Sequence, residues 1–176
     1  MTQENGSPSR PRILLPRHRS DWFLEIFGAI ALLALLLIVL FSWRLMPARV
    51  PIHYGLSGAP DAWGARELAL VLPALAVLLY ALLTAVAAVP HTFNYPWPIT
   101  PQNAERQYRL ARRMLLVLKN LIVLIFIVVF VKTWRTAVGT QTGLTPWFLP
   151  VVLLLVAGVI GWYFRAAHHR DTEDTE

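Results

Sequence analysis

Four long apolar runs, separated by polar and proline-rich connections, set the pattern of the chain. They cover Trp22–Trp43, Leu68–Val89, Met114–Val131 and Trp147–Phe164. Runs of about 18 to 22 residues form helices roughly 27 to 33 Å long, which matches the hydrocarbon thickness of a bilayer. The pattern therefore predicts an all-α integral membrane protein with four transmembrane helices.

Composition and tryptophan placement agree with this prediction. Hydrophobic residues make up 56% of the 176-residue chain and charged residues only 15%, a balance unsuited to a fully wetted surface. Tryptophan prefers the headgroup level of a membrane, where its ring is partly buried and its N–H stays hydrated. Of the seven tryptophans, all except Trp97 flank a predicted span.

Positive charge is distributed unequally between the two sides of the predicted spans. The N-terminal tail, the connection before the third span and the C-terminal segment together carry ten lysines and arginines, whereas the opposite side carries five. Positive charge favours the cytoplasmic side. We therefore expect both termini in the cytoplasm, the loop Met46–Gly64 outside, and a multi-pass protein of a cytoplasmic membrane.

The composition shifts along the chain divide it into five parts. Thr100 followed by Pro101 is typical of a helix start, so a basic helix should lead into the third span. The predicted parts are a disordered basic tail (1–20), a first helical hairpin with the outer loop (21–89), a cytoplasmic proline-rich connection and basic helix (90–113), a second helical hairpin (114–166) and an acidic tail (167–176).

The outer loop carries the densest group of candidate functional residues. Its prolines and glycines prevent either flanking helix from continuing, so it should be an ordered or semi-ordered loop at the membrane surface. The candidates are Pro47, Pro51, His53, Tyr54, Gly58, Pro60, Asp61, Trp63 and Gly64.

Little in this loop points to catalysis or metal binding. His53 and Asp61 are an incomplete zinc site, which favours a structural histidine at the interface, and Asp61 suits a turn. Ser57 lacks a motif that would hold a general base beside it. The chain has no cysteine, no phosphate-binding loop and no dinucleotide-binding fingerprint. We therefore assign no catalytic residue, metal or cofactor.

Glu25, Lys119 and Asn120 are strongly polar residues inside predicted spans. Such groups are costly at membrane depth unless they pair or reach the headgroups. Glu25 and Lys119 lie at nearly equal depths, roughly 6 and 9 Å past the cytoplasmic ends of their spans. Either they pair across the two helices, or each extends alone to the headgroups.

Arginines gather just before the third span, at Arg106, Arg109, Arg112 and Arg113. With a formal net charge of +6, nucleic acid is one conceivable partner, but these arginines border a span rather than a groove-sized domain. They are interpreted as facing the lipid bilayer, either as a solvated helical extension or as a specific lipid or partner site.

The loop spacing Pro47-x-x-x-Pro51-x-His53-Tyr54-x-x-x-Gly58-x-Pro60-Asp61-x-Trp63-Gly64 resembles bacterial membrane proteins that carry domain of unknown function 1648. That module also occurs at the N-terminus of SdpI-like immunity and signalling proteins, and the resemblance covers roughly residues 25–85. It implies a bacterial cytoplasmic-membrane protein, with resistance to or sensing of a secreted toxic peptide as a role in SdpI-like relatives.

Three functional hypotheses follow from these features. The leading one is a non-enzymatic sensing, immunity-like or envelope-interaction protein whose outer loop binds a peptide or protein. The alternative is a small transporter or transporter accessory subunit, and the third is a membrane-embedded enzyme. A homo-oligomer is compatible with each of them, and nucleic acid is not an expected partner.

Overall fold

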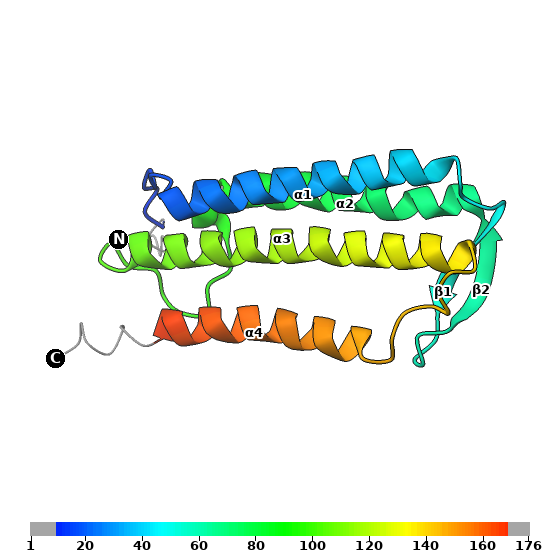
Figure 1. Cartoon of the computed structure of the whole chain (residues 1–176). Coiled ribbons are helices and arrows are strands. Elements are labelled where there is room, and N and C mark those ends of the chain that lie inside the picture. The colour runs from blue at the N-terminus through cyan, green and yellow to red at the C-terminus, as the bar shows by residue number, and fades with distance from the viewer. Residues whose placement is uncertain (1–9, 169–176) are drawn as a thin grey trace, which may run out of the picture.

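The computed structural model describes residues 10–168 and shows four helices running side by side, with a small sheet at one end (Figure 1). In chain order the elements are α1 (Arg19–Trp43), β1 (Arg49–Tyr54), β2 (Pro60–Ala65), η1 (Arg66–Leu70), α2 (Val71–Ala87), η2 (Pro90–Thr92), α3 (Ala104–Ala137) and α4 (Phe148–His168). We call the end with β1 and β2 the hairpin end, and the end where α1 begins and α4 finishes the terminal end.

All four helical segments are long and apolar enough to cross a membrane, by length and composition. They overlap the four apolar runs, so the prediction of four helices of spanning length is confirmed. Successive helices alternate in direction, which places the start of α1 and the finish of α4 at the same end (Figure 1). The assignment of that end to the cytoplasm stays a prediction.

The basic helix and the third predicted span form one continuous helix, α3, which is 34 residues long. A hydrogen-bonded turn at Thr100–Asn103 leads into it. Thr100 Oγ1 accepts a hydrogen bond from the Asn103 backbone N–H (3.3 Å), and Asn103 Oδ1 accepts one from the Thr100 N–H (2.9 Å). Ala104 N–H also donates to the Thr100 carbonyl. The helix itself begins at Ala104 with Asn103 as its N-cap, so the start predicted at Thr100 and Pro101 is three residues too early. The Thr100–Asn103 hydrogen bonds form a turn ahead of the helix, and Pro101 lies in that turn.

The all-α prediction is wrong at the outer loop, because β1 and β2 form a two-stranded antiparallel sheet. Val50 pairs with Gly64 and Pro51 with Trp63, and the register is irregular on both sides of His53. Proline argues against a central strand because it cannot donate a ladder hydrogen bond. In a two-stranded sheet both strands are edges, so this objection does not apply.

The central helix of the bundle is α3, which packs against α1, α2 and α4 and also contacts β1. One core cluster packs below the hairpin and consists of Leu35, Met46, Val50, Ala69, Ala76 and Phe130. A second cluster at the terminal end joins Ala111 of α3 to Tyr163 and Ala167 of α4, with aromatic residues of the 90–103 connection packed against it. Most side chains of α4 are exposed, which suits a helix surrounded by lipid.

The described part of the predicted basic tail contacts the helices. Residues 10–18 have no helix or strand, yet the Tyr108 hydroxyl donates to the Pro11 carbonyl (3.1 Å) and Arg112 Nη1 donates to the Leu15 carbonyl (3.3 Å). The segment is therefore held through its backbone carbonyls rather than through an apolar face, and α1 already begins at Arg19. Residues 1–9 and the acidic stretch 169–176 lie outside the described residues.

Candidate functional site: the motif hairpin and the polar cluster

The hairpin of β1 and β2 is fixed to the bundle at several points. The Tyr54 hydroxyl donates to Thr133 Oγ1 of α3 (3.0 Å), and the Leu144 backbone N–H donates to the Gly58 carbonyl at the hairpin tip (2.8 Å). Val50 is fully buried in the core cluster below the hairpin. The hairpin is therefore bound to both halves of the chain rather than free in solvent.

Gly58 is the motif position with the clearest steric requirement. Its φ of +82° is unfavourable for residues with a side chain, and a Cβ there would lie 2.0 Å from the Leu144 carbonyl oxygen. On the facing loop Gly143 has φ +133°, and its Cβ would lie 2.3 Å from the Gly58 carbonyl oxygen. Two backbones thus approach each other closely at this point, which explains why the motif has glycine here.

The residues of the hairpin that do not contact the bundle are exposed. His53 Nδ1 lies 2.6 Å from Asp61 Oδ1, and the two side chains are 70% and 52% exposed. Arg49 donates to the Trp63 carbonyl (3.3 Å), and the Trp63 side chain is itself exposed. Exposed ion pairs contribute little to stability, so the hairpin does not depend on the His53–Asp61 contact to stay folded.

The structure corrects one detail of the loop chemistry. Asp61 belongs to β2 and pairs with His53, rather than stabilising a turn. Ser57 at the tip accepts a hydrogen bond from the Ala59 N–H (3.4 Å). Among residues 10–168 no group of three His, Cys, Asp or Glu side chains is placed to hold a metal ion.

A second candidate site lies between the helices, where Lys119 and Glu25 form an ion pair with Nζ and Oε2 2.5 Å apart. Of the two arrangements left open by the sequence, the structure shows the pair. Lys119 also donates to Thr84 Oγ1 (2.9 Å) and lies 4.3 Å from the centre of the Tyr80 ring. We name Glu25, Tyr80, Thr84, Lys119 and Asn120 the polar cluster; it draws on α1, α2 and α3.

Asn120 links α3 to α1 through its side-chain amide. Its Nδ2 donates to the carbonyls of Leu24 (3.0 Å) and Leu116 (2.9 Å). Its Oδ1 has no hydrogen-bond partner and lies 2.3 Å from where a Cβ on Gly28 would be. The oxygen therefore faces the Gly28 Cα–H, a weak donor that commonly serves where helices pack closely in membranes.

Sequence reasoning missed Tyr80, Thr84 and Gly28 as members of this site. Tyr80 and Thr84 are four residues apart, so they share one face of α2, and Thr84 also donates to the Tyr80 carbonyl (2.7 Å). That spacing inside an apolar run was the available signal. Nothing local to the sequence indicates that Lys119 meets this face.

The four arginines in the basic first part of α3 do not form one surface directed at lipid. Arg106 donates to the Ala166 carbonyl and to the Ala167 carbonyl (3.4 Å), which satisfies the C-terminal end of α4. Arg109 pairs with Glu105 on the exposed side of α3. Arg112 binds the N-terminal segment, and Arg113 is exposed.

Four spanning-length helices with a hairpin across one end define a multi-pass, mostly helical membrane protein. A family model described as Domain of unknown function (DUF1648) matches residues 29–77, from α1 through the hairpin to the first turns of α2. The resemblance seen in the loop motif is therefore confirmed for this segment. Comparison with curated proteins and with solved structures found no match.

Proposed function

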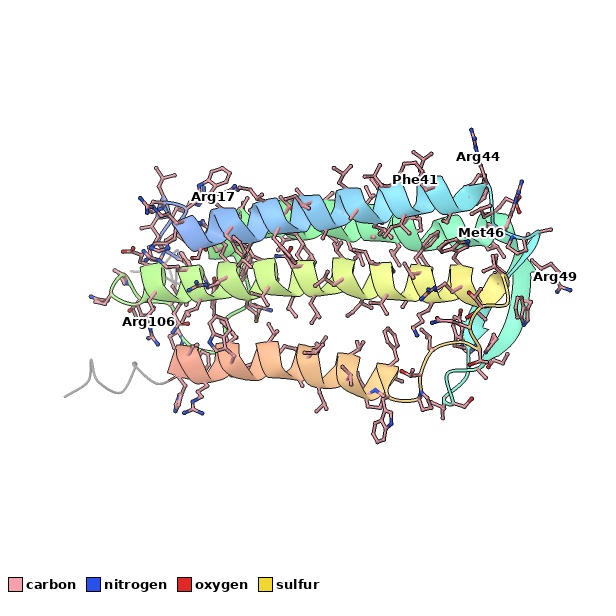
Figure 2. All side chains as sticks on the ribbon, viewed as in Figure 1. Arg17, Phe41, Arg44, Met46, Arg49 and Arg106 are labelled. Atoms are coloured by element: carbon pink, nitrogen blue, oxygen red, sulfur yellow. The ribbon has the colours of Figure 1, made fainter. Side chains whose placement is uncertain are left out.

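We propose that this chain is a non-enzymatic protein of the bacterial cytoplasmic membrane whose hairpin binds a peptide or protein at the outer surface, in a sensing or immunity role. The observation that supports this proposal is the two-sided construction of the hairpin. One side is anchored by Tyr54, Gly58 and Val50, while the other presents Arg49, His53, Asp61 and Trp63. Figure 2 labels Arg49 at the hairpin end, where its side chain projects away from the bundle.

The exposed side suits recognition for energetic reasons. A preorganised surface loses little conformational entropy on binding, so contacts made by an anchored hairpin retain more of their energy. Tryptophan and arginine dominate the energetics of protein interfaces because each combines a large apolar area with specific hydrogen bonds. Trp63 and Arg49 are therefore the residues expected to carry most of the binding energy.

The proposal is tested by separating recognition from folding. Cells that express Arg49→Ala or Trp63→Ala are challenged with secreted toxic peptides, and the membrane level of each variant is measured by immunoblot. Arg44→Ala is the matched control, since Arg44 is an exposed arginine just after α1 and outside the hairpin. Hairpin variants should lower peptide tolerance at unchanged membrane level, and the control should not. Unchanged tolerance in all three would overturn the proposal.

Topology provides an independent requirement. Reporter fusions at Gly6 and at Asp174 should both show a cytoplasmic location, and a fusion at Gly139 should show an external one. An external location for the two terminal fusions would place the hairpin in the cytoplasm and contradict binding at the outer surface.

The polar cluster favours a second candidate function, a small transporter or a transporter subunit. Ionisable groups inside a membrane commonly mark a path for ions or substrates, and Glu25 lines a crevice that reaches the terminal end. If this is the function, Glu25→Gln should abolish flux in proteoliposomes while Trp63→Ala leaves flux intact. If instead Trp63→Ala lowers peptide tolerance and Glu25→Gln does not, the result favours recognition.

A further inference from the structure

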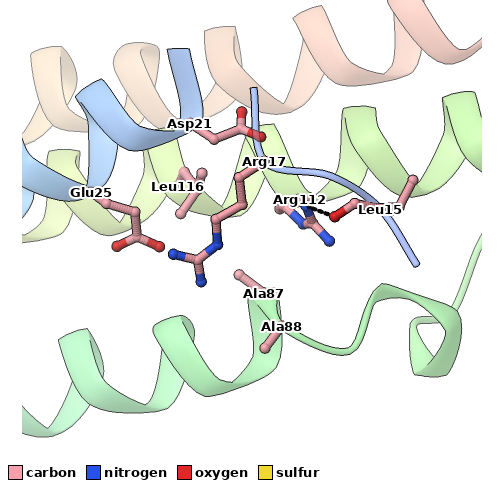
Figure 3. A pocket seen from close by; sticks show the side chains of 8 residues that line it. All are labelled: Leu15, Arg17, Asp21, Glu25, Ala87, Ala88, Arg112 and Leu116. Atoms are coloured by element: carbon pink, nitrogen blue, oxygen red, sulfur yellow. Dashed lines mark hydrogen bonds between the residues drawn. The ribbon is translucent and has the colours of Figure 1, made fainter. Parts of the chain in front are cut away.

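A crevice at the terminal end brings together charged side chains from three segments (Figure 3). Arg17 comes from the N-terminal segment, Asp21 and Glu25 from α1, and Arg112 from α3. Its volume is about 110 Å³, several times the roughly 10–15 Å³ that one water molecule requires. The crevice therefore has room for a small polar group such as a phosphate.

The two carboxylates of the crevice are already committed to partners. Asp21 Oδ2 accepts a hydrogen bond from the His18 backbone N–H (3.2 Å) at the start of α1, and Glu25 is paired with Lys119. Their negative charge is thus used in capping a helix and in balancing a buried ammonium. With the Glu25–Lys119 pair neutral, two guanidinium groups and one carboxylate leave the crevice with an excess of one positive charge.

The two guanidinium groups retain unused donors. Within residues 10–168, neither Arg17 nor Arg112 has a carboxylate oxygen within 4.0 Å. Arg112 uses Nη1 on the Leu15 carbonyl, and Arg17 lies over the Trp22 ring at 5.0 Å. Each guanidinium carries five N–H donors in a planar fork, a geometry that matches the oxygens of a phosphate.

The position and walls of the crevice indicate where such a phosphate comes from. Arg17 precedes α1 by two residues and Ala88 follows α2 directly, so the crevice lies where two spans meet the headgroup level. Leu15 and Leu116 add apolar surface beside the charges. A cationic rim with an apolar wall fits a group that is anionic at one end and apolar at the other.

We propose that Arg17 and Arg112 form a binding site for a phosphate oxyanion, supplied by the headgroup of an anionic phospholipid. This site is at the opposite end of the molecule from the hairpin and is independent of the peptide-binding proposal. The ligand bridges the N-terminal segment and α3, so its binding stabilises the contact between them. Free phosphate shares the recognised chemistry but lacks a chain to contact Leu15 and Leu116.

The full chain in an uncharged detergent is titrated with phosphatidylglycerol, with phosphatidylcholine, or with inorganic phosphate at matched ionic strength, and the thermal unfolding midpoint is followed by tryptophan fluorescence. Phosphatidylglycerol should raise the midpoint saturably, and more than the other two. Equal, saturable stabilisation by inorganic phosphate would identify the free anion as the ligand and overturn the lipid assignment. No saturable response to any of them would overturn the site itself.

Variants then test the assigned residues. Arg112→Gln and Arg17→Gln should each weaken the apparent affinity for phosphatidylglycerol by about tenfold or more, because each removes charge-assisted hydrogen bonds. Arg113→Gln is the matched control, since it removes the same charge one residue away on an exposed position. Arg17→Gln leaves the Arg112–Leu15 bond intact, so it separates ligand loss from local unfolding. If both variants respond to the lipid as Arg113→Gln does, the site is refuted.

Discussion

Removing one partner of the Glu25–Lys119 pair is the sharpest test of the polar cluster. In Glu25→Gln the Lys119 ammonium, which is only 1% exposed, keeps Thr84 Oγ1 and the Tyr80 ring but loses its counter-charge. Removing one partner of a buried pair typically costs about 3–5 kcal/mol, and the remaining contacts recover part of that. We expect the free energy of unfolding to fall by about 2–4 kcal/mol.

The opposite substitution should cost less, because the two partners differ in exposure. Glu25 is 15% exposed and lines the crevice, so in Lys119→Gln its carboxylate can be hydrated. A loss of about 1–2 kcal/mol is expected, and the double variant should cost less than the sum of the two by about 1–2 kcal/mol.

The measurement is equilibrium unfolding of the wild type and three variants in one detergent. The exposed pair Glu105–Arg109 on α3 supplies a control cycle, whose coupling energy should be close to zero. Strict additivity for Glu25 and Lys119 would refute the pair as a source of stability. A larger cost for Lys119→Gln than for Glu25→Gln would refute the reasoning from exposure.

Two glycine substitutions test the close approaches. Gly58→Ala and its control Gly139→Ala introduce similar backbone strain, at φ +82° and +78°. Only at Gly58 would the added methyl group meet the Leu144 carbonyl, so Gly58→Ala should lower the free energy of unfolding by about 1–3 kcal/mol more and expose the hairpin to protease. Equal losses in the two variants would contradict the contact. Gly28→Ala should lower the thermal unfolding midpoint because its methyl group would clash with Asn120 Oδ1. The decrease should be smaller when Gly28→Ala is made in an Asn120→Ala background. An unchanged midpoint in Gly28→Ala would refute the close packing of α1 and α3.

The helices are predictable from sequence because their determinant is local. A bilayer requires each spanning segment to satisfy its own backbone and to be apolar along its whole length, so composition in a window is enough. A local signal also places the entry to α3 to within one turn, because Thr100 and Asn103 bond each other just before the helix begins at Ala104. In both cases the residues that decide the structure are neighbours in the chain.

The hairpin and the polar cluster depend on contacts between distant segments. The sequence shows that Pro51 and Gly58 exclude helix, but strand pairing with Trp63 and the bond from Leu144 arise only from the fold. Depth along the spans suggested Glu25 and Lys119 as partners, whereas the spacing of Tyr80 and Thr84 indicates a polar face on α2 but not which residue it meets. The rotation of each helix about its own axis decides which polar residues of neighbouring helices meet. The local sequence pattern does not determine that rotation.

The unbroken length of α3 gives the molecule a mechanical property. Its 34 residues extend roughly 51 Å, about 20 Å more than the thickness of a bilayer's hydrocarbon layer. The Thr100–Asn103 turn holds one end, and Thr133 receives the hairpin near the other. A helix without proline or a break behaves as a stiff rod over this distance. One rigid element therefore connects the basic end of the molecule to the hairpin end.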